Sequence, residues 1–170
     1  MHFELSQEQE FIRETARKFA EERIAPIQEA DEKEGIFRRE LVAEMGALGF
    51  WGAVIPEEYG GTNMGFLGAV IIAEEIARIS ASYAGHFVSQ TVGPGLTILR
   101  QGTKDQKDKY VPGLVSGDLI GSFASTEPNA GSDVASMKTA ARKTEKGFIL
   151  NGTKTWITNA TVADLCLVFA

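Results

Sequence analysis

The sequence predicts an α+β protein with a helical bundle in its first part and a separate β-domain in its second. Over roughly the first two-thirds of the 170 residues, apolar residues recur at the spacing of amphipathic helices. After Gly117, short apolar and β-branched runs bounded by turn-forming residues indicate strands. Helices that precede the strands, instead of alternating with them, are typical of an α+β chain.

The helical part begins at a capping box. Ser6 can accept a backbone N–H group and Gln9 can reach back to the cap, so we expect a helix to start here. Its apolar residues share one side until Pro26, which ends the helix or lies just beyond it. A second helix is expected over residues 38–48, with Gly49 as its stop signal.

Further helical segments follow. Residues 65–80 are apolar almost all round, which predicts a helix inside the bundle and not on its surface. Residues 83–101 predict a helix that is broken or kinked at the Gly-Pro-Gly of residues 93–95. A second capping box at Thr103 opens a helix that is expected to stop at Gly117.

The second part predicts short strands over residues 119–125, 138–142, 147–151, 153–158 and 165–170, the second and third of them as a pair. The last run stays apolar up to the final residue, and so few strands make a thin sheet with unpaired edges. We therefore expect that the natural polypeptide continues.

Charge and hydropathy exclude some partners. A net charge of −6 without a basic stripe argues against a nucleic-acid partner, because phosphate binding needs clustered Lys and Arg. The most apolar stretch, residues 66–73, is shorter than the roughly 20 residues of a membrane-spanning helix, so we expect no membrane partner. The first residues lack the pattern of a signal peptide. We expect a cytoplasmic protein, or alternatively a mitochondrial matrix protein whose transit peptide has been removed.

The cysteine and histidine residues predict no metal site. The chain has one cysteine, Cys166, and two histidines, His2 and His86. Their positions favour neither a zinc cluster nor a Cys–His nucleophile pair. Cys166 lies in an apolar run and is interpreted as a buried structural thiol of a reducing compartment. His86 lies in an apolar helix and is interpreted as a hydrogen-bonded core residue.

Two segments combine residues that suit a ligand. Residues 123–133 run from a strand end into a loop of small residues, whose backbone N–H groups can face an anion, and Thr126 adds a hydroxyl group. Trp156 offers a flat face and Thr158 a second hydroxyl group, which suits stacking against a ring system. Residue chemistry alone favours an ordinary hairpin-like connection for the first segment and leaves a core tryptophan open for the second.

Longer motifs decide between these alternatives. The chain carries TEPNAGSD at residues 126–133, LNGTKTWITN at 150–159, LGFWG with PEEYGG at 48–52 and 56–61, and EEIAR at 74–78. In their order along the chain (48–61, 74–78, 126–133, 150–159) these four blocks resemble the acyl-CoA dehydrogenase family over essentially the whole chain. The resemblance implies an N-terminal helical domain (residues 1–117), the first part of a β-barrel-like middle domain (residues 118–170), and a C-terminal helical domain that is absent from this chain.

The resemblance also implies the site residues. FAD would contact Phe123, Ala124, Ser125, Thr126, Gly131, Ser132, Trp156, Ile157 and Thr158, and acyl-CoA would contact Ser132, Gln90, Thr91 and Gly93. In this family the catalytic base comes from the C-terminal domain, so no catalytic residue is assigned here. This segment alone is therefore expected to be inactive.

The implied reaction is the FAD-dependent α,β-dehydrogenation of an acyl-CoA to a 2-enoyl-CoA. An electron-transfer flavoprotein would accept the electrons, and the enzyme would be a homotetramer or a homodimer. No arginine occurs between Ile79 and Leu99, which favours a neutral acyl group over a dicarboxylic one, because a buried carboxylate needs a partner. Two alternatives stay open: an acyl-CoA oxidase or related flavin oxidase of the same fold, and a non-catalytic binding module if the natural chain ends at Ala170.

Overall fold

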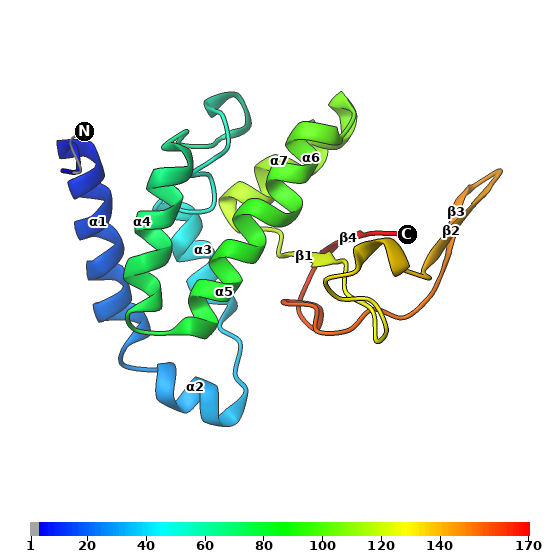
Figure 1. Ribbon diagram of the computed structural model, residues 1–170. Helices are drawn as coiled ribbons and strands as arrows, with labels where there is room; N and C mark the ends of the chain where they lie inside the picture. Colours follow the sequence, from blue (N-terminus) through cyan, green and yellow to red (C-terminus); the bar gives the residue numbers. More distant parts are fainter. Residues whose placement is uncertain (1–3) are drawn as a thin grey trace.

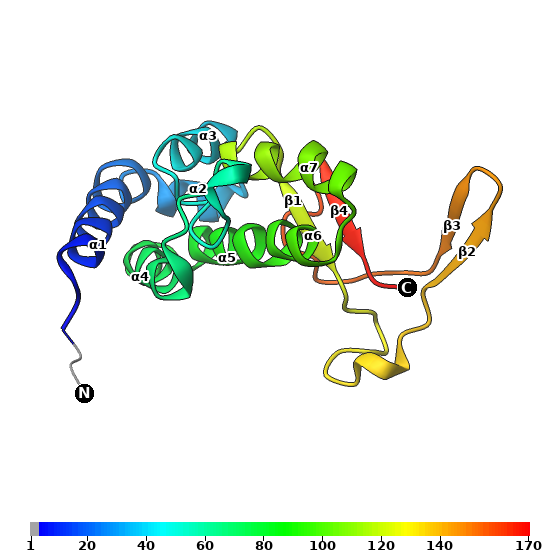
Figure 2. The same cartoon turned by 90° about the horizontal axis from the view of Figure 1, so that it is seen from above.

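A computed structural model describes residues 4–170; residues 1–3, with His2 among them, lie outside this description. Helices come first and strands second along the chain (Figure 1). In both views the helices lie side by side, and the strands β1 and β4 lie next to the α5–α7 side of the bundle (Figure 1, Figure 2). The α+β architecture expected from the sequence is confirmed.

The helices are α1 (Gln7–Phe19), α2 (Gln28–Glu34), α3 (Arg39–Ala47), α4 (Gly65–Ala77), α5 (Ala81–Gln90), α6 (Leu96–Gln101) and α7 (Lys104–Ser116). Both predicted capping boxes form, at Ser6 and at Thr103. The expected kink lies at Thr91–Gly95, a π-helical turn between α5 and α6 that contains Pro94. Proline cannot donate to the helical hydrogen-bond ladder, which accounts for the widened turn.

Helix α2 was not predicted, because its sequence QEADEKE has no apolar periodicity. An ion pair holds it in place. Arg38 donates to the buried carboxylate of Asp31 at 2.7 Å, and the hydroxyl group of Tyr83 donates to the same carboxylate at 2.8 Å. Tertiary contacts therefore stabilise this helix where its own apolar residues cannot.

The core lies between the helices and is centred on Trp51. The ring of Trp51 is 1% exposed and stacks on Phe87 with a centroid distance of 5.7 Å. Its Nε1 donates to the carbonyl oxygen of Val42 at 2.8 Å, so the buried indole N–H group is satisfied. The apolar residues 50–55, which include Trp51, thus lie in the centre of the bundle.

The strands are β1 (Gly121–Ala124), β2 (Ala140–Thr144), β3 (Gly147–Asn151) and β4 (Leu165–Val168). Strands β1 and β4 pair in parallel, with Gly121 opposite Leu165. Strands β2 and β3 form an antiparallel hairpin. Both views show that this hairpin points away from the helices (Figure 1, Figure 2).

The structure corrects three expectations. Helix α4 is not enclosed by the bundle, because Phe66, Leu67 and Val70 are 55%, 51% and 59% exposed; only its face toward α1 and α5 is covered. Residues 153–158 form no strand, since the backbone turns at Trp156 with φ of 57°. Cys166 is exposed and not buried, because β4 has a neighbouring strand on one side only within residues 4–170.

Candidate functional site

The end of β1 and the segment after β3 meet beside α5. They enclose a hollow of about 450 Å³ together with the π-helical turn and α6. It is lined by Val88, Ser89, Val92, Gly93, Thr97, Phe123, Ser125, Thr126, Trp156, Ile157 and Thr158. Three stretches that are distant in sequence thus contribute apolar groups and hydroxyl groups to one concave surface.

A buried ion pair joins the two motifs that line this hollow. Glu127, only 7% exposed, accepts hydrogen bonds from the backbone N–H groups of Lys138 at 2.7 Å and Thr139 at 2.8 Å. Lys154 donates to Glu127 at 2.9 Å and to the carbonyl oxygen of Ser125 at 2.8 Å. Thr139, the Lys138 N–H group and Lys154 lower the pKa of Glu127 to about 2. The carboxylate is therefore ionised at neutral pH.

Sequence reasoning missed the pairing of Glu127 with Lys154. Both residues lie inside the two motifs, at positions that suggested no ligand chemistry. A carboxylate followed by proline in a loop of small residues, with one lysine in the second motif, was the available signal. Only the fold shows that these two side chains meet.

The segment of residues 156–158 lies between two anchors. The Thr155 N–H group donates to the carbonyl oxygen of Thr126 at 3.0 Å. Beyond the segment, Asn159 contacts His86 and donates to the carbonyl oxygen of Gly121 at 2.9 Å. Within residues 4–170 the amide groups of residues 156–158 donate to no backbone acceptor, and Trp156 is 89% exposed. An exposed aromatic side chain and backbone N–H groups without a backbone acceptor thus belong to a segment that lines the hollow.

The predicted FAD residues separate into two groups. Phe123, Ser125, Thr126, Trp156, Ile157 and Thr158 all line the hollow. Ala124 is buried at 3% exposure, as expected for the alternate position of a strand. Gly131 and Ser132 are exposed in the loop after β1 and do not line the hollow within the described residues.

Two predicted substrate residues of the π-helical turn, Gly93 and Thr91, differ in their position relative to the hollow. Gly93 lines the hollow, and a Cβ atom there would meet the Cβ of Phe123 at 3.3 Å. Glycine therefore allows the turn to approach β1 closely. Thr91 is 2% exposed, and its hydroxyl group has no hydrogen-bond partner in residues 4–170.

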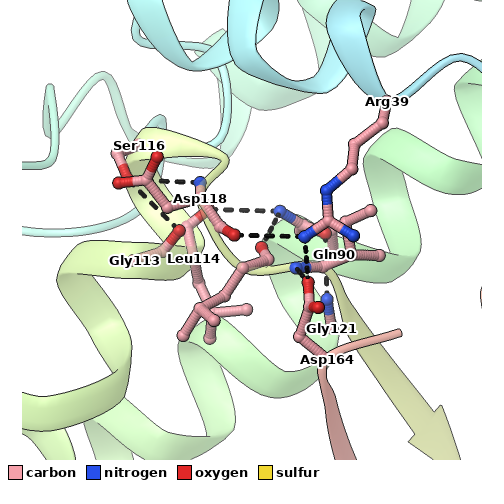
Figure 3. A network of polar contacts seen from close by, with 10 residues as sticks. Arg39, Gln90, Gly113, Leu114, Ser116, Asp118, Gly121 and Asp164 are labelled. Atoms are coloured by element: carbon pink, nitrogen blue, oxygen red, sulfur yellow. Dashed lines mark hydrogen bonds and ion pairs between the residues drawn. The ribbon is translucent and has the colours of Figure 1, made fainter. Parts of the chain in front are cut away.

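Gln90 has a structural position. Its side chain is 1% exposed, and Nε2 donates to the carbonyl oxygens of Leu114 at 3.2 Å and Leu119 at 3.1 Å. Its Oε1 accepts from the N–H group of Gly121 at 3.1 Å (Figure 3). Since every polar atom of this amide is occupied by the backbone, we do not carry Gln90 into the proposed substrate site.

The same network continues at the surface. Asp164 accepts from the Ile120 N–H group at 2.9 Å and from Arg39 at 2.5 Å (Figure 3). The Ile120 N–H group and the Arg39 guanidinium lower the pKa of Asp164. Helices α3, α5 and α7 are thereby tied to the starts of β1 and β4, and the end of β1 lies at the hollow.

Comparison with family models gives two matches along the chain. Residues 6–118 match the acyl-CoA dehydrogenase N-terminal domain, and residues 122–170 match the acyl-CoA dehydrogenase middle domain. The chain belongs to the acyl-CoA dehydrogenase family. The family predicted from the motifs is thus confirmed.

Individual relatives agree with this membership. A glutaryl-CoA dehydrogenase of Desulfococcus multivorans is 43% identical over 100% of this chain and 44% of its own length. A mitochondrial 2-methylacyl-CoA dehydrogenase of Solanum tuberosum is 44% identical over 98% of this chain and 41% of its own. A glutaryl-CoA dehydrogenase of Mycobacterium smegmatis, solved in complex with FADH2, is 34% identical with a TM-score of 0.93 over 98% of this chain and 43% of its own. The chain thus spans less than half the length of these relatives.

Residues 4–170 of this acyl-CoA dehydrogenase chain show neither a membrane-spanning helix nor a metal-binding cluster. Between residues 4 and 170, no helix has the length and apolar character needed to cross a membrane. The same residues contain no group of three or more His, Cys, Asp or Glu side chains that could hold a metal ion. No metal ligand is therefore assigned.

Proposed function

We propose that the protein containing this chain is an FAD-dependent dehydrogenase that converts an acyl-CoA to a 2-enoyl-CoA. The observation that carries the proposal is the convergence of both family motifs on one hollow, held together by Glu127 and Lys154. We further propose that residues 1–117 are the N-terminal helical domain and residues 118–170 the first part of the middle domain.

The residues around the hollow fit a flavin. Trp156 presents an open aromatic face, while the hydroxyl groups of Thr126 and Thr158 and the free N–H groups of residues 156–158 are hydrogen-bond donors. When bound, FAD supplies the acceptor for the hydride. Donors placed around its ring system stabilise the negative charge that develops, and they need no rearrangement because the segment is anchored at both ends. Ala124, which is buried in β1, would support this site without lining the hollow. Gly131 and Ser132 would approach the bound ligands from the loop after β1.

The acyl group would enter beside α5 and the turn. Val88 and Val92 give this wall an apolar surface, and Gly93 keeps it close to β1. We propose Thr91, Gly93 and Ser132 as the substrate contacts of this chain. No arginine lies between Ile79 and Leu99, so we propose a neutral acyl group. Relatives of similar identity are named for glutaryl and for 2-methylacyl groups, so overall likeness does not select the acyl group.

No residue of this chain is assigned as the base that removes the α-proton. Glu127, a buried carboxylate beside the hollow, is committed to Lys154 and to two backbone N–H groups, and its low pKa makes it a poor proton acceptor. We propose that a further part of the protein supplies the base and that an electron-transfer flavoprotein accepts the electrons. We also propose a homo-oligomer, a tetramer or a dimer, located in the cytoplasm or the mitochondrial matrix.

The proposal is tested on the protein expressed from its complete reading frame. The purified protein should carry FAD, and a neutral acyl-CoA should bleach the flavin absorbance and yield the 2-enoyl-CoA. Reoxidation should need an electron-transfer flavoprotein or an artificial acceptor. Rapid reoxidation by oxygen would instead assign an oxidase of the same fold, and absence of flavin binding would leave a non-catalytic module.

A further inference from the structure

His86 joins the helical bundle to the segment that carries Trp156 and Thr158. Its Nδ1 lies 2.7 Å from Oδ1 of Asn159, a residue 73 positions later in the chain. Asn159 donates in turn from Nδ2 to the carbonyl oxygen of Gly121, at the start of β1, at 2.9 Å. Two side chains thus connect α5, the segment at the hollow and the first strand.

The carbonyl group of Gly121 fixes the direction of these hydrogen bonds. A carbonyl oxygen can only accept, so the Asn159 atom beside it is the amide nitrogen, and the atom that faces His86 is the amide oxygen. His86 therefore carries a proton on Nδ1 and donates it to Asn159. Burial lowers the pKa of His86 against the weaker opposing effect of Asn159, which favours the neutral ring.

The packing around His86 holds this donor in one place. The side chain is 6% exposed, and the ring meets Phe37 edge to face with a centroid distance of 5.3 Å and Trp51 with one of 5.1 Å. Both neighbours belong to the core cluster of the bundle or pack against it. Because this packing holds the His86 ring in place, its Nδ1–H group holds Asn159 at a fixed position relative to the helical bundle.

The backbone of the segment that receives this contact adopts a conformation that its own residues do not favour. Its first residue, Trp156, has φ of 57°, and Asn159, which follows the segment, has φ of 67°. Left-handed backbone at residues other than glycine persists only where the surroundings hold it. A cavity of about 160 Å³, whose lining includes His86, Thr158 and Asn159, offers space into which the segment can shift when the contact is lost.

We propose that His86 is a positioning residue of the flavin site, which acts through Asn159 to fix the path of residues 156–158 along the hollow. The inference rests on the proposed function, because the hollow is taken as the flavin site. It assigns to His86 no proton transfer and no contact with substrate.

Two variants separate this role from ordinary packing. His86→Phe keeps an aromatic ring against Phe37 and Trp51 and removes the Nδ1–H donor. His86→Asn loses the ring and places an amide N–H donor near the position of Nδ1. The protein from the complete reading frame is used, and three quantities are measured: visible circular dichroism of bound FAD, the FAD dissociation constant from flavin fluorescence, and the melting temperature of the apoprotein.

For His86→Phe we expect an altered flavin dichroism and FAD binding weakened by about five- to tenfold, with an apoprotein melting temperature near that of the wild type. His86→Asn should restore the dichroism and the affinity even where it lowers the melting temperature. Wild-type flavin properties in His86→Phe, or a flavin defect that follows the melting temperature of both variants alike, would overturn the proposal.

Asn159→Gly provides a second route if His86→Phe does not fold. Glycine keeps the left-handed backbone and removes both the acceptor for His86 and the donor to Gly121, so FAD binding should weaken by at least the same factor. Where both single variants fold, adding His86→Phe to Asn159→Gly should bring no further loss, since the contact that it breaks is already absent. Additive losses would contradict the inference. A wild-type protein that binds no FAD would instead contradict the proposed function itself.

Discussion

Lys154 Nζ lies 2.9 Å from Oε1 of Glu127, and the two side chains are 11% and 7% exposed. This contact joins the loop after β1 to the segment after β3. Both partners are satisfied further by the backbone, through Ser125 on one side and the N–H groups of Lys138 and Thr139 on the other. A buried charge pair of this kind is destabilising when one partner is lost.

The first prediction concerns acid stability. The pKa of Glu127 falls from 4.5 to about 2 on folding, so its contribution to stability is present above pH 4.5 and is lost as the pH falls towards 2. Glu127→Gln should lower the melting temperature at neutral pH and flatten its decline between pH 4.5 and 2. The measurement is a series of thermal melts across this interval.

Glu145→Gln is the matched control, because Glu145 is exposed in the turn between β2 and β3. It should keep the wild-type decline, which includes the other carboxylates whose pKa is lowered, namely Asp31, Glu44, Glu75 and Asp164. Equal slopes in Glu127→Gln and the wild type would show that this carboxylate is not held in its ionised form.

The second prediction concerns Gln90. Gln90→Leu removes the side-chain donor to the carbonyl oxygens of Leu114 and Leu119 and the acceptor of the Gly121 N–H group, so the free energy of unfolding should fall by about 2–4 kcal/mol. Gln101→Leu, at an exposed position of α6, should change it by less than about 0.5 kcal/mol. Urea denaturation measures both. A small effect of Gln90→Leu would return this residue to the candidates for substrate contact.

The third prediction compares two glycines with left-handed backbone. A Cβ atom at Gly117 would lie 2.5 Å from the carbonyl oxygen of Val42, which also accepts the Trp51 N–H group, whereas one at Gly35 would meet nothing within 4 Å. Gly35→Ala should therefore cost about 1–2 kcal/mol from backbone strain alone. Gly117→Ala should cost at least about 1 kcal/mol more, because the steric overlap adds to it. Chemical denaturation of the two variants should reproduce this order.

The fourth prediction tests Trp156 as a ligand residue. Its side chain is 89% exposed, so Trp156→Ala should leave the apoprotein melting temperature nearly unchanged. FAD binding should weaken by about tenfold, because an aromatic contact of roughly 1 kcal/mol or more is removed. Trp156→Phe should retain most of the affinity. A flavin affinity unaffected by Trp156→Ala would remove this side chain from the proposed site.

Local signals accounted for most of the helices. The capping boxes at Ser6 and Thr103, the stop at Gly117 and the interruption at Pro94 depend on neighbours in sequence, and all lie where the sequence predicts them. Helix α2 was missed because an ion pair with Arg38 stabilises it, and residues 153–158 were predicted as a strand although no partner strand reaches them. The burial of a side chain also depends on neighbours in space, which explains why the predicted burial of α4 and of Cys166 was wrong.

The sequence by itself determined the order of helices and strands, since this follows from local chemistry and spacing. Its resemblance to the acyl-CoA dehydrogenases indicated the family and the two motifs that carry the candidate site. Only the tertiary structure decided which of those residues face the hollow. It showed that the Gln90 amide is hydrogen-bonded to backbone groups, that Lys154 forms an ion pair with Glu127, and that His86 donates to Asn159. Each of these contacts joins residues 24 or more positions apart, and such a distance can be closed only by the packing of the whole chain.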